Sequence, residues 1–314
     1  MPPKLSVVHQ ASSELTSAMV DHRRDLRARN KSESTIRAYE WAVELLDRHL
    51  AERGRPRDPA QVTRDDIREF VTVQRETKSD VTAATYFAAL GAFFSFCVAE
   101  GIIDRSPFEG LRSPAVGTTP VQTLSEAEVE ALLRVTSGRS FVDRRDHAII
   151  RLLLDTGARR AELMGLALDD VDLDAEPPRF LIRHGKGNKA RWAPFGNLAA
   201  KALSHYLRAR RTHRRAESSA LWLSPWGPMK PNALNSILVV RCQQAGITRI
   251  GAHRFRHGFA DRMLSAGMNE GDLMRLGGWA NSTMIQQRYG ASRADARAME
   301  AYARIGAPGD HDRT

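Results

Sequence analysis

The sequence predicts a mainly α-helical protein with a small β-sheet, an α+β fold, arranged as two domains. Apolar residues recur at three- and four-residue spacings through the first hundred positions, which is the period of amphipathic helices. Residues 113–120 (SPAVGTTP) have no such period and are typical of an interdomain linker. Beyond them, two strand-like segments flank the glycine-rich basic stretch 185–189, which indicates a β-hairpin.

Composition narrows the class of protein. The 314 residues are long enough for two cores, and 42% of them are hydrophobic, as in globular proteins. A formal net charge of +10 favours a polyanionic partner, of which nucleic acid is the commonest. Cys97 and Cys242 lack ligand spacing, so we expect free thiols in a reducing compartment and no metal site or other cofactor. No run of 18 apolar residues occurs, which predicts a cytoplasmic protein.

The first domain is predicted over residues 12–112 as four short helices. We expect a helix break at 30–32, a loop at 54–59 and an acidic capping box formed by Thr63 and Asp66. A last helix should span Val81 to Ala99, with an apolar face of Tyr86, Leu90, Phe93, Phe94 and Val98. Basic residues gather near the first break, either as a solvated face or as a phosphate-binding surface. They are Arg23, Arg24, Arg27, Arg29, Lys31 and Arg37.

The second domain is predicted over residues 121–306, followed by a disordered tail at 307–314. Ser125 and Glu128 form a capping box at its start. Further helices are expected at 146–155, at 158–163 after the Thr156-Gly157 break, at 199–215 with a basic, solvated end, and at 232–245 before Gly246. The strands of the hairpin should lie at 179–184 and 190–195.

Three stretches of the second domain carry residues suited to phosphate chemistry. Arg159 stands at a helix start with Glu162 three residues on, a spacing at which the carboxylate can orient the guanidinium. His253, Arg256 and His257 share one face of a helix and can converge on a small anion. An ordinary Arg–Glu pair or a basic helix would explain either pattern alone. The third stretch follows the Gly277-Gly278-Trp279 turn and ends in Tyr289-Gly290. Its tyrosine could act as a movable nucleophile.

Together these motifs resemble the tyrosine recombinase (phage integrase) family: TGxRxxE, GKGxKxR, HxxRH, GGW and RY. The resemblance implies a helical core-binding (SAM-like) domain and a catalytic domain that cuts DNA through a 3′-phosphotyrosine bond. The catalytic residues would be Arg159, Lys186, His253, Arg256, Trp279 and Tyr289, with Glu162 and His257 in support. Lys189 is the alternative to Lys186. The implied partners are double-stranded DNA with inverted half-sites and further copies of the chain, as a dimer and then a tetramer on DNA.

Elementary chemistry agrees with those roles. Two guanidiniums can grip the non-bridging oxygens of a phosphodiester with paired donors and stay charged. A phenol with a pKa of about 10 needs a base, for which His253 is suited, and the leaving 5′-oxygen needs a proton, which Lys186 can supply. Because the arginines carry the compensating charge, no metal is required. Because the protein–DNA ester conserves the bond energy, no ATP is required.

Two departures from the family pattern bear on the finer function. Trp279 stands where many members have a second histidine, and its indole N–H can donate to an oxygen but cannot shuttle a proton. Tyr289 follows Trp279 by ten positions, so we expect a one-residue insertion within 280–283. The resolvases of chromosome dimers end LGHxxxxTTxxYTH, so GGW with RYG favours integration or excision of a phage or other mobile element. Alternatives are a dimer resolvase, a type IB topoisomerase and a catalytically silent DNA-binding regulator.

A short amphipathic helix is predicted at 294–305. Ala298, Tyr302 and Ile305 form a narrow apolar stripe, and a helix of this length needs a docking partner to be stable. It could dock on its own domain, but the family resemblance favours a neighbouring protomer.

Overall fold

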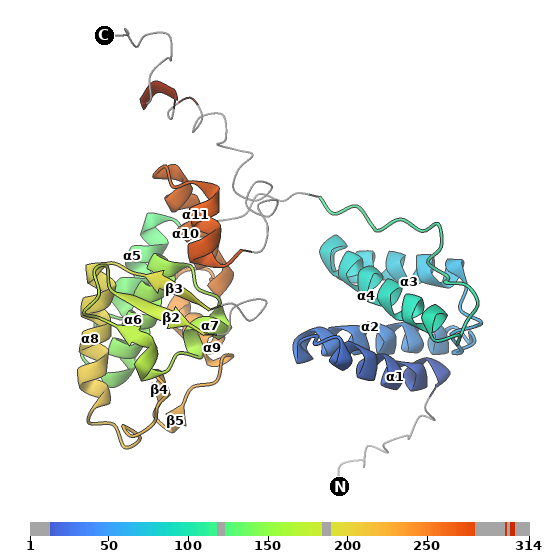
Figure 1. Cartoon of the computed structure of the whole chain (residues 1–314), viewed down its shortest axis with the longest axis horizontal. Coiled ribbons are helices and arrows are strands. Elements are labelled where there is room, and N and C mark those ends of the chain that lie inside the picture. Colours follow the sequence, from blue (N-terminus) through green and yellow to red (C-terminus); the bar gives the residue numbers. More distant parts are fainter. Residues whose placement is uncertain (1–12, 118–122, 184–189, 280–298, 300–301, 305–314) are drawn as a thin grey trace. The chain divides into compact units, whose positions relative to one another are not determined.

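The computed structural model describes residues 13–117, 123–183, 190–279, 299 and 302–304. The chain divides into two compact units, Met1–Thr119 and Pro120–Thr314, which Figure 1 labels by element. Helices dominate both units and small sheets occur in the second, so the predicted α+β class is confirmed. The predicted domain boundaries, with a linker at 113–120, remain predictions.

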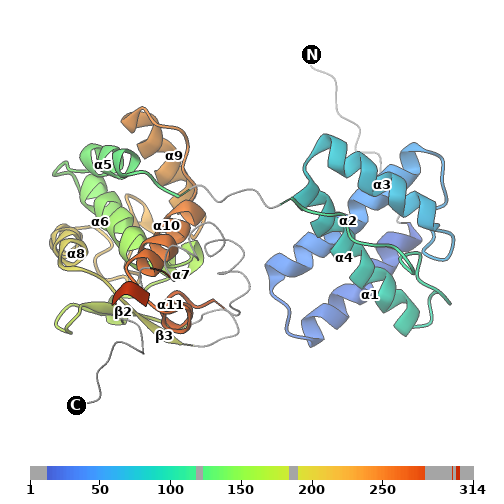
Figure 2. The same cartoon turned by 90° about the horizontal axis from the view of Figure 1, so that it is seen from above.

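The first unit is a bundle of four helices: α1 (Glu14–Ala28), α2 (Glu33–Glu52), α3 (Arg64–Thr77) and α4 (Asp80–Ala99). Helix α1 packs on α2, α3 packs on α4, and α4 also packs on α2 (Figures 1 and 2). Each helix begins after a hydroxyl side chain that accepts a backbone N–H of the first turn. These caps are Ser13, Ser32, Thr63 and Ser79, and Thr63 forms the predicted capping box with Asp66.

Helix α4 forms the centre of this core. Its phenylalanines Phe93 and Phe94 are fully buried, whereas Val98, predicted on the same face, is 38% exposed because the neighbouring Cys97 turns inward instead. By length and composition alone, α4 is apolar enough to cross a membrane. Within the unit it packs as the core helix of the bundle, against α2 and α3.

The second unit begins with α5 (Glu126–Val135), α6 (Phe141–Thr156) and the short α7 (Arg160–Met164). A 3₁₀ turn, η1 (Leu168–Asp170), leads to a three-stranded antiparallel sheet in the order β1-β2-β3. Its strands are β1 (Val171–Asp172), β2 (Arg179–Ile182) and β3 (Arg191–Pro194). Strands β2 and β3 form the predicted hairpin, with Phe180 opposite Ala193 and Ile182 opposite Arg191.

The remaining elements follow the sheet along the chain. They are α8 (Asn197–Arg210), β4 (Leu223–Ser224), β5 (Gly227–Pro228), α9 (Ala233–Ala245), α10 (Ala252–Ser265) and α11 (Glu270–Gly277). Helix α6 lies between α8 and α10 and packs on both (Figure 2). The Ser125–Glu128 capping box and the helix ends at Gly157 and Gly246 are as predicted, and both glycines adopt the left-handed conformation.

One predicted helix was too long, and one arginine of its basic end was misjudged, while Arg208, Arg211, Arg214 and Arg215 are exposed as predicted. Helix α8 ends at Arg210 rather than at 215. Arg210 is not solvated but 4% exposed, and it donates to the carbonyls of Ala216, Ser218, Ala220 and Leu221 at 2.6–3.1 Å. Those carbonyls belong to a loop that folds back over the helix end, which stops the helix. The short strands β1, β4 and β5 were not predicted, because two residues are too few to show a period.

Candidate active site

Arg159 is placed by the turn between α6 and α7. Gly157 ends α6 in the left-handed conformation, with φ of 54°, and Arg159 is then the N-cap residue of α7. Its backbone N–H donates to Glu162 Oε2 at 2.9 Å, and its Nη1 donates to Oε1 at 2.7 Å. The carboxylate of Glu162 is 5% exposed, while the side chain of Arg159 is 30% exposed. A buried carboxylate therefore orients a guanidinium that solvent still reaches.

Helix α10 carries the three residues of the predicted HxxRH motif. Arg256 and His257 are 3% and 5% exposed, whereas His253 is exposed. The rings of His253 and His257 meet edge to face with centroids 4.4 Å apart, so the buried histidine supports the exposed one. Arg256 Nη1 donates to the carbonyl of Gly157 at 2.8 Å, which ties α10 to the turn that presents Arg159.

The GGW turn brings a tryptophan onto Arg256. Gly278 ends α11 with φ of 67°, and a Cβ on Gly277 would lie 1.7 Å from the Trp279 ring, so only glycine lets the ring fold back along the helix end. The ring is 8% exposed, and the guanidinium carbon of Arg256 lies 3.7 Å from its centroid, a cation–π contact. The carbonyl of Gly278 accepts from Arg159 Nη2 at 2.5 Å. The turn thus contacts both arginines.

Arg191 in β3 was not singled out from the sequence. Its guanidinium donates to both oxygens of Glu162, at 3.1 and 2.7 Å, and to the carbonyls of Leu276 and Gly277, at 3.0 and 3.2 Å. Burial by itself would raise the pKa of Glu162, but the hydrogen bonds from Arg191 and from the Arg159 backbone outweigh burial and lower that pKa. The sequence signal for Arg191 is the final R of GKGxKxR, at the start of the second strand of the hairpin.

A second missed residue connects α10 to the start of the unit. Arg254 Nη2 donates to the carbonyl of Thr123 at 2.8 Å and to Glu128 Oε2 at 2.9 Å. Since Glu128 also caps α5, the first helix of the unit is fixed to the helix that carries His253 and Arg256.

Three predicted positions lie outside the described residues. Lys186 and its alternative Lys189 belong to 184–189, the connection between β2 and β3, and Tyr289 belongs to 280–298, together with the expected insertion at 280–283.

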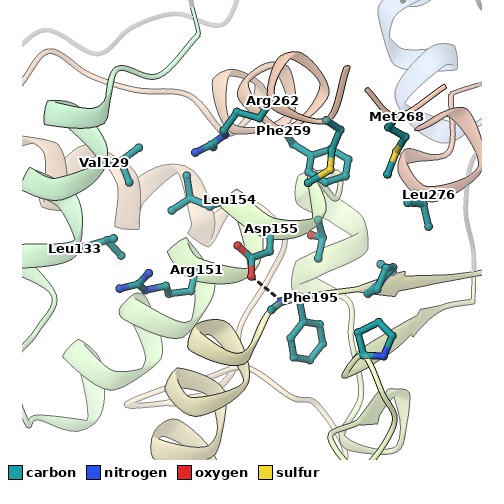
Figure 3. Close-up of a pocket in the computed structure, with 16 residues that line it drawn as sticks. Val129, Leu133, Arg151, Leu154, Asp155, Phe195, Phe259, Arg262, Met268 and Leu276 are labelled. Atoms are coloured by element: carbon teal, nitrogen blue, oxygen red, sulfur yellow. Dashed lines mark hydrogen bonds between the residues drawn. The ribbon is translucent and has the colours of Figure 1, made fainter. Parts of the chain in front are cut away.

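A cavity of about 580 Å³ lies beside this site (Figure 3). Its wall is mostly apolar, with Leu133, Leu154, Phe195 and Phe259 among the lining residues, while Arg151, Asp155 and Arg262 bring polar groups to it. Asp155 Oδ2 accepts the backbone N–H of Gly196 at 2.9 Å, the dashed line in Figure 3. Among the described residues, its lining does not include Arg159, His253, Arg256 or Trp279.

Comparison with known proteins identifies the class. Residues 122–295 match the phage integrase family, and residues 21–101 match the phage integrase N-terminal SAM-like domain. The chain belongs to the phage integrase family of tyrosine recombinases, which are DNA strand-exchange enzymes.

Among its relatives is the tyrosine recombinase XerD of Mycobacterium leprae (strain TN), 32% identical over 278 residues that cover 82% of this chain and 87% of the relative. The tyrosine recombinase XerC of Roseiflexus castenholzii (strain DSM 13941 / HLO8) is 32% identical over 281 residues, covering 87% and 88%. Solved structures with the same fold include the Tn1549 transposon integrase in complex with transposon right end DNA, at a TM-score of 0.74 and 22% identity, covering 91% of this chain and 99% of that one. Another is the XerH site-specific recombinase bound to a palindromic difH substrate, at a TM-score of 0.70 and 20% identity, covering 92% and 84%.

Proposed function

We propose that this chain is a site-specific recombinase that cuts and rejoins double-stranded DNA through a covalent 3′-phosphotyrosine intermediate. The supporting observation is the cluster of Arg159, Arg256 and Trp279, which one glycine turn and one buried carboxylate hold together. Fixed positive charge of this kind is what a phosphoryl-transfer transition state requires. We expect the enzyme to act in the cytoplasm.

In the proposed reaction, the Tyr289 hydroxyl attacks the scissile phosphorus, the bond from phosphorus to tyrosine oxygen forms, and the bond to the 5′-oxygen breaks. Arg159 and Arg256 bind the non-bridging oxygens as negative charge grows on them. His253, exposed at the start of α10, accepts the phenol proton. Lys186 donates a proton to the departing 5′-oxygen. Rejoining is the reverse attack by a 5′-hydroxyl on the phosphotyrosine.

Trp279 acts in this scheme through Arg256. Its ring covers the guanidinium at 3.7 Å, a contact that favours the cation and limits its movement. The buried ring of His257 packs edge to face against His253 and so limits the movement of this proposed general base.

The finer role we propose is integration or excision of a phage or other mobile element, because Trp279 and the RYG sequence depart from the dimer-resolvase pattern. The second candidate is resolution of chromosome or plasmid dimers, which the relatives named XerD and XerC favour. A plasmid assay separates them. Recombination between the two DNA ends that flank the gene supports the first role, and resolution of a plasmid dimer at a chromosomal site supports the second.

The SAM-like unit and the catalytic unit would together bind one half-site, and pairs of half-sites would assemble a dimer and then a tetramer. Solved relatives are described as bound to a palindromic substrate and, for lambda integrase, as a tetramer on a Holliday junction. Because the chain is strongly basic, we expect its DNA affinity to fall steeply with salt concentration.

The segment 294–305 would connect neighbouring protomers in that assembly. Of its apolar side chains in the described part of the chain, Met299 and Tyr302 are 73% and 55% exposed, so these two are not buried in the single chain. We propose that they enter the apolar cavity of Figure 3 on a second copy. A chain stopped after Arg293 should bind single half-sites normally but not form tetramers. Recombination at the full-length rate would contradict this proposal.

The experiment that tests the chemistry replaces the proposed nucleophile. Tyr289→Phe should bind a half-site duplex with unchanged affinity and form no covalent complex on a suicide substrate, because the variant loses only a hydroxyl. Tyr86→Phe is the matched control, since it removes a tyrosine hydroxyl from the first unit, away from the proposed site and from the docking segment, and it should form the complex at the normal rate. A covalent band with Tyr289→Phe would show that another residue attacks.

A further inference from the structure

We propose that Arg191 is a positioning residue of the cleavage site: it fixes Glu162 and neutralises the charge of that carboxylate, so that Arg159 keeps its own positive charge for the DNA phosphate. This inference rests on the proposed role of Arg159 as a ligand of the scissile phosphate.

The charges of the cluster favour this role. Glu162 contacts two guanidiniums, Arg159 Nη1 at 2.7 Å and Arg191 Nη1 and Nη2 at 3.1 and 2.7 Å. With Arg159 alone, the carboxylate would form a neutral pair, and the guanidinium would offer little net charge to a phosphate. With Arg191 included, two positive groups and one negative group leave one net positive charge.

The exposed fractions of the side chains distinguish the two arginines: one is enclosed with the carboxylate, and the other reaches solvent. The side chains of Arg191 and Glu162 are 12% and 5% exposed, and that of Arg159 is 30% exposed. Arg191 is thus enclosed with the carboxylate, while Arg159 extends from the same carboxylate toward solvent. A buried carboxylate without a full complement of donors is costly, so Arg191 also stabilises the charged form of Glu162.

Arg191 also fixes the turn that contacts Arg159 from the other side. Its Nε and Nη2 donate to the last carbonyls of α11, those of Leu276 and Gly277. The next residue, Gly278, accepts from Arg159 Nη2 at 2.5 Å. A Cβ on Gly278 would lie 2.7 Å from the Arg191 guanidinium, so the glycine makes room for it. Glu162, Arg191, the turn and Arg159 therefore form a closed ring of contacts.

The geometry requires arginine at this position. Its planar fork donates two parallel bonds to a carboxylate and still has donors for the helix carbonyls, whereas a lysine ammonium offers one compact charge.

The first experiment measures single-turnover cleavage of a half-site suicide substrate by Arg191→Met. We expect the rate to fall about 10- to 100-fold, with unchanged half-site affinity. Arg191→Lys should recover part of the loss. The matched control is Arg179→Met in the same sheet, since Arg179 is also ion-paired, to Asp172 at 3.3 Å, but does not touch Glu162, and this variant should cleave normally.

Two further measurements separate positioning from a loss of folded protein. Adding Glu162→Gln to Arg191→Met removes the negative charge of the carboxylate that Arg191 neutralises. The double variant should therefore cleave about tenfold faster than Arg191→Met alone. A scissile methylphosphonate, which carries no negative charge, should reduce the defect of Arg191→Met as it reduces that of Arg159→Ala. The ratio of the two substrate rates does not depend on the fraction of active protein.

Wild-type cleavage by Arg191→Met would overturn the inference, as would a loss that neither Glu162→Gln nor the methylphosphonate relieves. Arg159→Ala decides the proposed function separately. If that variant cleaves the normal phosphate at the wild-type rate, the role of Arg159 itself fails. If it is inactive while Arg191→Met is normal, only the role of Arg191 fails.

Discussion

The two units of the chain bury polar groups in different ways. Among the described residues, no arginine of the first unit is buried, and its interior polar side chains include His22 and His49, which lie against aromatic rings. In the described part of the second unit, four arginines are buried: Arg145, Arg210, Arg241 and Arg256. The helical bundle thus has a mainly apolar and aromatic core, whereas guanidiniums are part of the core of the catalytic unit.

The reason lies in the backbone. Long helices satisfy their own N–H and C=O groups, so a bundle needs few side-chain donors inside. The second unit has short strands, loops and helix ends whose carbonyls would otherwise be buried without a donor. Arginine has five N–H donors and can serve several carbonyls at once. Arg210 donates hydrogen bonds to four backbone carbonyls. Arg145 donates to the carbonyl of Leu223, and Arg256 donates to the carbonyl of Gly157. The residues suited to phosphate binding therefore belong to a wider set of structural arginines.

The largest effect should follow from removing the counterion of buried arginines. Asp146 is 2% exposed and accepts from Arg145 and Arg241 at 2.8 Å each. Asp146→Ala leaves both guanidiniums without this partner, so we expect a loss of about 3–5 kcal/mol in the free energy of unfolding of the second unit. Urea denaturation measures it. Asp65→Ala, which breaks an exposed pair with Arg68 in the first unit, should cost less than about 1 kcal/mol. Equal effects of the two substitutions would contradict the comparison.

A smaller effect should follow from a side chain at Gly157. Its φ is 54°, and a Cβ there would lie 2.6 Å from the Phe259 ring on α10. Gly157→Ala therefore strains the backbone and pushes α10 away, at a cost of about 1–3 kcal/mol. Because the Gly157 carbonyl holds Arg256, cleavage should fall further than the melting temperature suggests. The control is Gly246→Ala, with a similar φ of 66° and nothing within 4 Å of the added Cβ, which should affect stability alone.

The smallest effect concerns pH and the first unit. Burial lowers the pKa of His22 and of His49 below the ordinary histidine value of about 6.5. A lowered pKa means that the folded state binds fewer protons than the unfolded state, so stability is full above pH 6.5 and decreases as the pH falls below it. Each histidine contributes a slope of at most about 1.4 kcal/mol per pH unit. Hydrogen exchange of α1 and α4 at pH 5 and 7.5 should show this loss, and His22→Phe should reduce it. An unchanged pH dependence in that variant would rule out His22 as the cause.

Local sequence predicted most of the helical structure. The Thr63–Asp66 and Ser125–Glu128 capping boxes and the helix ends at Gly157 and Gly246 are found as predicted, because caps and glycine ends depend on residues within one turn of each other. The predicted end of α8 was wrong because it depends on contacts with a more distant part of the chain. Arg210 binds carbonyls of a loop six to eleven residues further along the chain, and no helical period records that contact.

For the site, the sequence by itself determined which residues could do the chemistry. Arginines near a helix start and on a helix face, a histidine pair and a tyrosine beside glycine are local patterns, and their order along the chain indicates the family. The pairing of Arg159 with Glu162 was also predictable, since three residues separate them.

Only the tertiary structure decided how those residues are held. Arg191 meets Glu162 across 29 positions of sequence, Arg159 meets Gly278 across 119, and the Trp279 ring lies on Arg256 because two glycines permit the turn. Contacts of this kind have no sequence period, since they arise when separate elements pack together. Fixed spacing within a helix determined the candidates, and the packing of α7, β3, α10 and α11 determined which guanidinium is enclosed with the carboxylate and which stays accessible.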